Sequence, residues 1–183
     1  MSIDIKPGRY EIDPVHSTIG FSTRFVAARV RGRFLAFSGT VAVADDLLNS
    51  SVQATIDVAS VHTGTAQRDE HLRGEDYFDV AHHPEATFTS TGIEADGDRY
   101  TLRGDLTIRG TTRPVQLDMY FTGDGEDHYG NFRLGFRAGT RVSRSAFGVA
   151  GNVSQPGGPL LMGDATDLTM EIQAIAAVVE AAA

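Results

Sequence analysis

Apolar and polar residues alternate with a period of two along most of this chain. In residues 51–61, Val52, Ala54 and Ile56 fall on one face, and polar side chains fall between them on the other. The same alternation returns in three further segments, residues 113–122, 131–141 and 167–178. One apolar face and one polar face is the pattern of strands in an antiparallel sheet.

Turn residues divide these alternating segments into eight predicted strands. Asp-Gly turns stand near residues 96 and 124, and a Pro-Gly loop occupies 156–159. The strands are predicted near 9–25, 30–44, 51–61, 86–94, 99–109, 114–123, 131–144 and 166–179. Closure removes exposed sheet edges, so an all-β, single antiparallel eight-stranded barrel is favoured, with a two-sheet sandwich as the alternative. No repeat or linker interrupts the chain, so residues 1–183 are predicted to form one domain.

One segment departs from the strand pattern. Residues 65–73 predict a short helix that begins at Thr63 or Thr65 and ends at Gly74. Apolar residues are spaced through this acidic segment and the residues that follow it: Leu72, Tyr77, Phe78, Val80 and Phe88. We expect the segment to act as a lid over one mouth of the barrel, with its acids outward and its aromatic side chains inward.

Composition excludes several classes of function. The formal net charge of −8 argues against general nucleic-acid binding and against non-specific adhesion to anionic membranes. The absence of Cys excludes thiol catalysis, disulfides and Cys-based metal sites. No run approaches the ~20 apolar residues of a membrane-spanning helix. The first residues contain no apolar signal region, so we expect a cytoplasmic location.

The histidines around residue 80 are candidate metal ligands. His71, His82, His83 and Glu85 would form the centre of a metal-assisted hydrolase, which is the main alternative function. Their spacing is poor, because adjacent His82 and His83 point to opposite faces of an extended chain and no His pair has helical i, i+4 spacing. No nucleophile-elbow motif is present either. We therefore expect no catalytic residue, no metal and no cofactor.

Several segments carry a combined resemblance to a known family. They are YEIDPVHS at 10–17, VRGRF at 30–34, QRDEHLR at 67–73, YFDV at 77–80, PEATF at 84–88, LRGDLTIRG at 102–110 and RSAFG at 144–148. Together these segments resemble the YceI-like family of polyisoprenoid-binding proteins, and the resemblance covers about residues 9 to 176. The resemblance implies a lipocalin-like barrel whose interior holds a long lipid, and a homodimer.

The residues independently favour an internal cavity. An eight-stranded barrel is near the size at which side chains either fill the interior or leave room for one ligand. The chain has no Trp, and its strands carry small residues such as Gly104, Gly135 and Ala138. A glycine in a strand can instead mark a bulge, and this alternative remains open for each of them.

The predicted ligand contacts follow from these two lines of reasoning. The predicted contacts to an apolar tail are Phe21, Phe34, Ile56, Val58, Leu106, Ile108, Leu117, Met119, Leu134, Phe136 and Phe147. Arginine is the natural partner of an anionic head group because its planar fork donates two parallel hydrogen bonds. The predicted lid and head-group contacts are Arg68, His71, Leu72, Tyr77, Phe78 and Arg144. Two other arginine sets are assigned to the wet outer face: Arg29, Arg31 and Arg33, and Arg133, Arg137 and Arg141.

The sequence thus predicts a barrel that binds a long-chain isoprenoid or similar lipid, as carrier or store, and that is not an enzyme. A fully packed barrel that acts through association is the third interpretation, beside the metal-assisted hydrolase.

Overall fold

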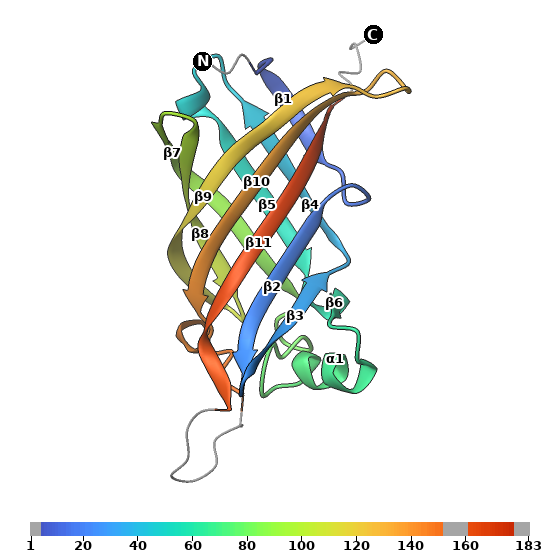
Figure 1. Cartoon of the computed structure of the whole chain (residues 1–183), viewed down its shortest axis with the longest axis vertical. Helices are drawn as coiled ribbons and strands as arrows, with labels where there is room; N and C mark the ends of the chain where they lie inside the picture. Colours follow the sequence, from blue (N-terminus) through green and yellow to red (C-terminus); the bar gives the residue numbers. More distant parts are fainter. Residues whose placement is uncertain (1–4, 152–160, 178–183) are drawn as a thin grey trace.

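The computed structural model describes residues 5–151 and 161–177, and its strands form one closed antiparallel barrel (Figure 1). The strands are β1 (Gly8–Ile12), β2 (Thr18–Phe25), β3 (Ala28–Phe34), β4 (Phe37–Val43), β5 (Ser51–Asp57), β6 (Val61–His62), β7 (Glu85–Asp96), β8 (Arg99–Ile108), β9 (Thr111–Glu126), β10 (Phe132–Ser143) and β11 (Met162–Ala176). The helical elements in the described ranges are α1 (Ala66–Arg73), η1 (Leu47–Asn49), η2 (Val58–Ser60) and η3 (Ser145–Phe147). None of these helices is long and apolar enough to cross a bilayer.

Eight strand paths make up the barrel, because three paths are each built from two consecutive elements. β1 and β2 both pair with β11, and the β1–β11 pairing closes the barrel. β4 and β3 pair with β1 and β2, and β5 and β6 pair in turn with β4 and β3. The eight paths coincide with the eight predicted strands, so the predicted closed barrel is confirmed. The loop predicted at 156–159 and the predicted strand residues 178–179 lie outside the described residues.

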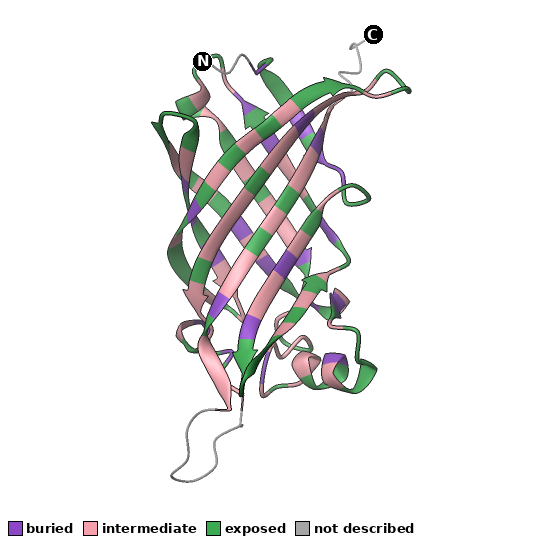
Figure 2. Cartoon of the chain, in the orientation of Figure 1, coloured by how far each residue is buried: buried purple, intermediate pink, exposed green. Residues whose placement is uncertain are grey.

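The alternating apolar and polar residues of the strands face the barrel interior and the outer surface, respectively. On β8, Leu102, Gly104 and Leu106 are buried, whereas Arg103 and Asp105 between them are exposed. Figure 2 shows the same banding of exposed and less exposed residues along the other strands. Most of the arginines assigned to the outer face are exposed, namely Arg29, Arg31, Arg33, Arg137 and Arg141.

Two strand glycines, Gly104 and Gly135, lie in close contact with neighbouring side chains and do not border the interior cavity. A Cβ on Gly104 would lie 2.4 Å from the Phe88 ring, so the glycine lets that ring lie against β8. At Gly135 the register with β9 shifts and skips Thr122, and a Cβ there would lie 2.5 Å from the Thr122 Oγ1. Gly135 therefore marks a β-bulge. Gly104 likewise stands where the register with β7 shifts and skips Thr91, so the bulge alternative holds at both positions.

The helix α1 has the predicted bounds, and none of its residues lines the barrel interior. It lies beside β6 at the lower right of Figure 1. The carboxylate of Asp69 accepts hydrogen bonds from the Thr63 N–H at 2.8 Å and the Thr63 hydroxyl at 2.6 Å. Asp69 is only 4% exposed, so the expectation that every acid of this segment faces outward is wrong. Phe78, in the loop after the helix, is the residue of this segment that reaches the barrel interior.

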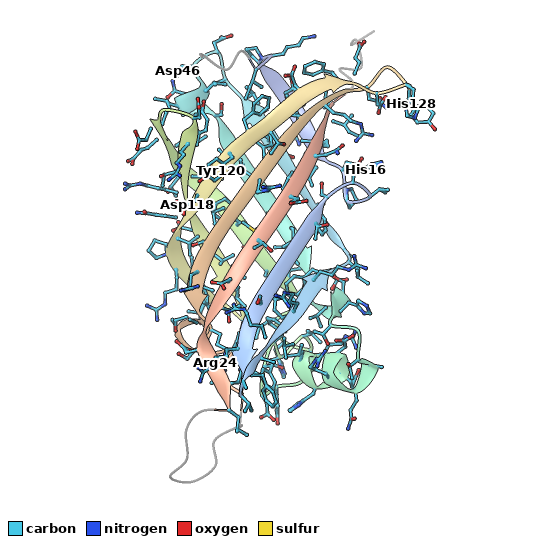
Figure 3. All side chains as sticks on the ribbon, in the orientation of Figure 1. His16, Arg24, Asp46, Asp118, Tyr120 and His128 are labelled. Carbon is cyan, nitrogen blue, oxygen red and sulfur yellow. The ribbon has the colours of Figure 1, made fainter. Side chains whose placement is uncertain are left out.

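A buried ion cluster fixes the corner between β1 and β2. The carboxylate of Asp13 lies 2.7 Å from Arg133 Nη1 and 2.6 Å from the Nδ1 of His16, which Figure 3 labels, and it accepts the Val15 N–H at 2.9 Å. Arg133 Nε also donates to Asp127 at 2.7 Å. The Arg133 side chain is only 19% exposed, so its assignment to the wet outer face is wrong. Its partners come from loops far apart in the sequence, and strand alternation does not reveal them.

A candidate apolar ligand cavity

The barrel encloses an elongated cavity with a volume of about 190 Å³. Its lining residues come from all eight strand paths and from the loops at both ends. Leu47, next to the Asp46 labelled in Figure 3, lines one end, and Phe78 from the segment after α1 lines the other. The cavity therefore runs along the barrel axis between a loop end and the end near α1.

Most of the predicted tail contacts line this cavity. They are Phe34, Ile56, Val58, Leu106, Ile108, Leu117, Met119 and Phe136. Period-two alternation placed them correctly on the inner face. That these side chains contact a ligand stays a prediction.

Three predicted tail residues lie outside the cavity lining. Leu134 and Phe147 are 0% and 2% exposed, and each belongs to a packed apolar cluster. The Phe21 ring lies 5.7 Å from the Phe34 ring and directly over Gly32. All three side chains pack against protein. Alternation tells which face Phe21 and Leu134 take but not how deep along the barrel they lie, and Phe147 belongs to η3, outside the strands.

Sequence reasoning missed other lining residues. They include Ile12, Ile19, Phe88, Phe121, Met170 and Ile172. The signal was present for three of them, since Phe121 continues the apolar face of β9, and Met170 and Ile172 continue that of β11. Ile12 and Ile19 flank the corner between β1 and β2, where the period is interrupted.

The lining contains no charged side chain. Its polar members are Ser50, whose hydroxyl accepts the Ala44 N–H at 3.0 Å, and Tyr100. Within residues 5–151 and 161–177, the Tyr100 hydroxyl has no hydrogen-bond partner. A charge brought into such a lining would lose its hydration without gaining a partner, which costs several kcal/mol or more. The cavity is therefore suited to an uncharged, apolar occupant.

The two arginines predicted to bind a head group are engaged elsewhere. Arg68 donates to the Thr63 carbonyl at 2.8 Å and to the Thr63 hydroxyl at 2.7 Å. Arg144 donates to the carbonyls of Gly163 and Val149, each at 2.8 Å. Both guanidinium groups thus hold loops in place, and neither lines the cavity.

The other predicted lid residues pack against one another. The His71 ring meets the Tyr77 ring edge-on, with centroids 5.0 Å apart. Tyr77 is 3% exposed, and burial raises the pKa of its hydroxyl. Leu72 packs against the same apolar cluster as Tyr77. These side chains support the cavity end formed by Phe78 and do not line it.

The ligands proposed for a hydrolase do not assemble. No group of three or more His, Asp or Glu side chains in the described ranges is arranged to hold a metal ion. His82 Nδ1 lies 2.8 Å from Asp79 Oδ1, and that hydrogen bond raises the pKa of His82. The His83 ring packs against Gly110 in the β8–β9 turn, and Glu85 is exposed at the start of β7. The geometry offers the hydrolase alternative no support.

Substituting these histidines should separate packing from metal binding. His82→Ala should lower the melting temperature by no more than about 2 °C, because its side chain is 74% exposed. His83→Ala should lower it more, since it removes the contact with Gly110. Neither variant nor EDTA should change the metal content measured by elemental analysis. A stoichiometric metal that is lost on either substitution would instead support the metal-assisted hydrolase as the function.

A closed antiparallel barrel around an apolar, charge-free cavity defines the class of lipocalin-like barrels, which enclose one small apolar site. Comparison with known proteins narrows the class. A family model described as YceI-like domain matches residues 10–174. Protein YceI of Escherichia coli O157:H7 is 36% identical over 144 residues, 76% of this chain and 75% of the relative. A UPF0312 protein of Pectobacterium atrosepticum is 39% identical over 145 residues, 77% of this chain and 74% of the relative. The chain belongs to the YceI-like family, as the resemblance predicted.

Solved structures share the barrel. BcnA of Burkholderia cenocepacia superposes with a TM-score of 0.78 at 26% identity, covering 88% of this chain and 98% of that one. The YCEI protein of Campylobacter jejuni gives a TM-score of 0.72 at 27% identity, covering 82% and 86%. A domain from Saccharophagus degradans, described as polyisoprenoid binding, gives 0.68 at 16% identity, covering 94% and 100%, and shows the common fold alone.

Proposed function

We propose that this protein binds a long-chain apolar lipid, a polyisoprenoid or a related isoprenoid or fatty molecule, inside the barrel. On this proposal it acts as a carrier or store and by binding, without catalysis. The observation that carries the proposal is the elongated cavity whose lining is apolar apart from Ser50 and Tyr100 and contains no charged side chain. The polyisoprenoid-binding description of the Saccharophagus domain agrees with it, although that ligand belongs to a distant relative.

Burial of hydrocarbon supplies enough free energy for such binding. Each buried CH₂ group contributes about 0.8 kcal/mol, so a five-carbon isoprene unit contributes roughly 3–4 kcal/mol before ordering costs. A few units therefore reach the affinity range of specific non-covalent complexes. No catalytic group or cofactor is needed for this function.

The lining also suggests which head group the ligand carries. With no cation in the cavity, and with Arg68 and Arg144 bound to protein oxygens, a diphosphate would have no internal partner. The Tyr100 hydroxyl can give or take one hydrogen bond. These features favour an isoprenoid with an uncharged head, such as an alcohol or a carbonyl compound.

Mass spectrometry tests the proposal directly. Protein purified from a bacterial host should carry an apolar ligand that is present under native conditions and released under denaturing conditions, because burial of many CH₂ groups makes dissociation slow. Delipidated protein should then bind geranylgeraniol at least about tenfold more tightly than geranylgeranyl diphosphate. If the purified protein showed only the mass of the polypeptide and took up neither compound, the proposed lipid-binding function would be refuted.

A homodimer, which the family resemblance implies, and a cytoplasmic location are part of the same proposal. Sedimentation velocity of the purified protein tests the dimer. Cell fractionation tests the location.

A further inference from the structure

The hairpin between β2 and β3 exposes an apolar tip. The loop consists of Val26 and Ala27 alone, and Phe25 and Val26 are 41% and 53% exposed. The tip stands at the lower end of the barrel, beyond the Arg24 labelled in Figure 3. Exposed apolar residues that gather at the end of a hairpin mark an interaction surface more often than isolated ones do.

The tip also holds an unfavourable backbone conformation. Val26 has a φ of 53°, in the left-handed region that a β-branched residue adopts at a cost in free energy. A two-residue hairpin loop that needs a positive φ at its first position normally has glycine there. Val26 therefore combines backbone strain with an exposed apolar side chain, while its N–H donates to the Leu161 carbonyl at 2.7 Å. A contact outside the protein would explain why an apolar side chain stands there.

The hairpin itself is basic, whereas the whole chain is acidic, and Asp167 on the neighbouring strand β11 is already paired with Arg29 and Arg141. Residues 14–44 contain four arginines, at 24, 29, 31 and 33, and no Asp or Glu, whereas the chain carries a formal net charge of −8. All four arginines are exposed. Arg24 and Arg31 form no ion pair with any described residue, so their guanidinium groups are available to an external anion.

We propose that this hairpin docks on the surface of a bilayer that contains anionic phospholipids. Phe25 and Val26 enter the boundary between head groups and acyl chains, while Arg24 and Arg31 contact lipid phosphates. The apolar tip distinguishes this partner from a nucleic acid, which would need cations without an apolar wedge. The site is separate from the cavity, so it does not depend on which ligand the barrel holds.

The placement of the hairpin gives docking a consequence for the barrel. β3 continues from the tip to Phe34, whose ring lies 5.8 Å from the ring of Phe78 at the lower cavity end. Docking would therefore turn the cavity end near α1 toward the membrane. The formal net charge argues only against adhesion by the surface as a whole, and it does not describe this local basic patch.

Co-sedimentation with vesicles tests the proposal. Wild-type protein should pellet with vesicles of phosphatidylcholine and phosphatidylglycerol, pellet weakly with phosphatidylcholine alone, and be released by salt. Arg24→Gln/Arg31→Gln should weaken binding roughly 25-fold, since each cation near an anionic surface is worth about fivefold. Phe25→Ser/Val26→Ser should weaken it by about tenfold.

Matched controls stand at the opposite end and side of the barrel. Tyr129→Ser removes an aromatic side chain that is 82% exposed in the β9–β10 turn, beside the His128 labelled in Figure 3. Arg99→Gln/Arg103→Gln removes two exposed arginines of β8. Both controls should bind vesicles as wild type does. All variants should take up geranylgeraniol from detergent solution normally, which keeps this test distinct from the test of ligand binding.

Several results would overturn the proposal. They are wild-type protein that ignores anionic vesicles, hairpin variants that bind them as tightly as wild type, and control variants that lose binding equally. If Phe25→Ser/Val26→Ser instead converted an oligomer to a monomer without changing vesicle binding, the hairpin would be an interface between copies of the chain. Wild-type protein could also bind duplex DNA and not vesicles, with the arginine variants losing DNA binding. That result would show that the partner of the hairpin is a nucleic acid and not a membrane.

Discussion

Ala138→Trp should greatly weaken ligand binding and leave the barrel folded. Ala138 lines the cavity on β10, and its cross-strand neighbours are Met119 on β9 and Met170 on β11. An indole at this position would project into the cavity, and the flexible methionine side chains can move to accommodate it. We expect binding of geranylgeraniol to weaken at least about tenfold, measured by displacement of a fluorescent lipid.

The neighbouring residue provides the matched control. Arg137→Trp places the same side chain on the outer face and breaks only the exposed ion pair with Glu171, at 3.3 Å. It should keep wild-type uptake. Melting temperatures must be compared on delipidated protein, because a bound ligand itself raises the melting temperature. If the interior were packed solid, Ala138→Trp would instead lose roughly 1–3 kcal/mol in the free energy of unfolding, and the carrier proposal would fail.

The barrel was predictable because its strands obey one simple rule. β8 alternates buried Leu102 and Leu106 with exposed Arg103, and a period of two identifies such a strand without tertiary information. The breaks within three of the strand paths were not predictable in the same way. β1 ends at Ile12, and Asp13 directly after it binds Arg133, a residue 120 positions away in the sequence. No local pattern encodes a partner at that distance.

The candidate site was predictable in its chemistry more than in its boundaries. Alternation places Leu117 and Phe136 on the lining, and it places Leu134 on the same inner face. Leu134 differs only in its depth along the barrel, which depends on register with β11. The roles of Arg68 and Arg144 were harder to predict, because most of their partners are backbone carbonyls whose positions follow from loop conformation alone.

Weakening the corner between β1 and β2 should produce a pH-dependent loss of stability. Burial acts to raise the pKa of Asp13, but hydrogen bonds from Arg133, His16 and the Val15 N–H outweigh it and lower that pKa to about 2. A carboxyl group whose pKa is lowered by folding stabilises the protein above its unfolded-state pKa, near 4. That contribution is lost as the pH falls from about 4 toward 2.

Asp13→Asn should therefore unfold more easily than wild type at pH 7, by on the order of 1–2 kcal/mol after allowance for partial screening by solvent. In a chain of this size the change lowers the melting temperature by roughly 3–6 °C. The gap between the two proteins should narrow as the pH is lowered, because wild-type Asp13 becomes protonated and loses the same attraction to Arg133. Asp118→Asn, at an exposed position on β9 labelled in Figure 3, is the control and should follow wild type at every pH. A gap between Asp13→Asn and wild type that stays constant from pH 7 to pH 2 would show that the ionised carboxylate does not hold this corner.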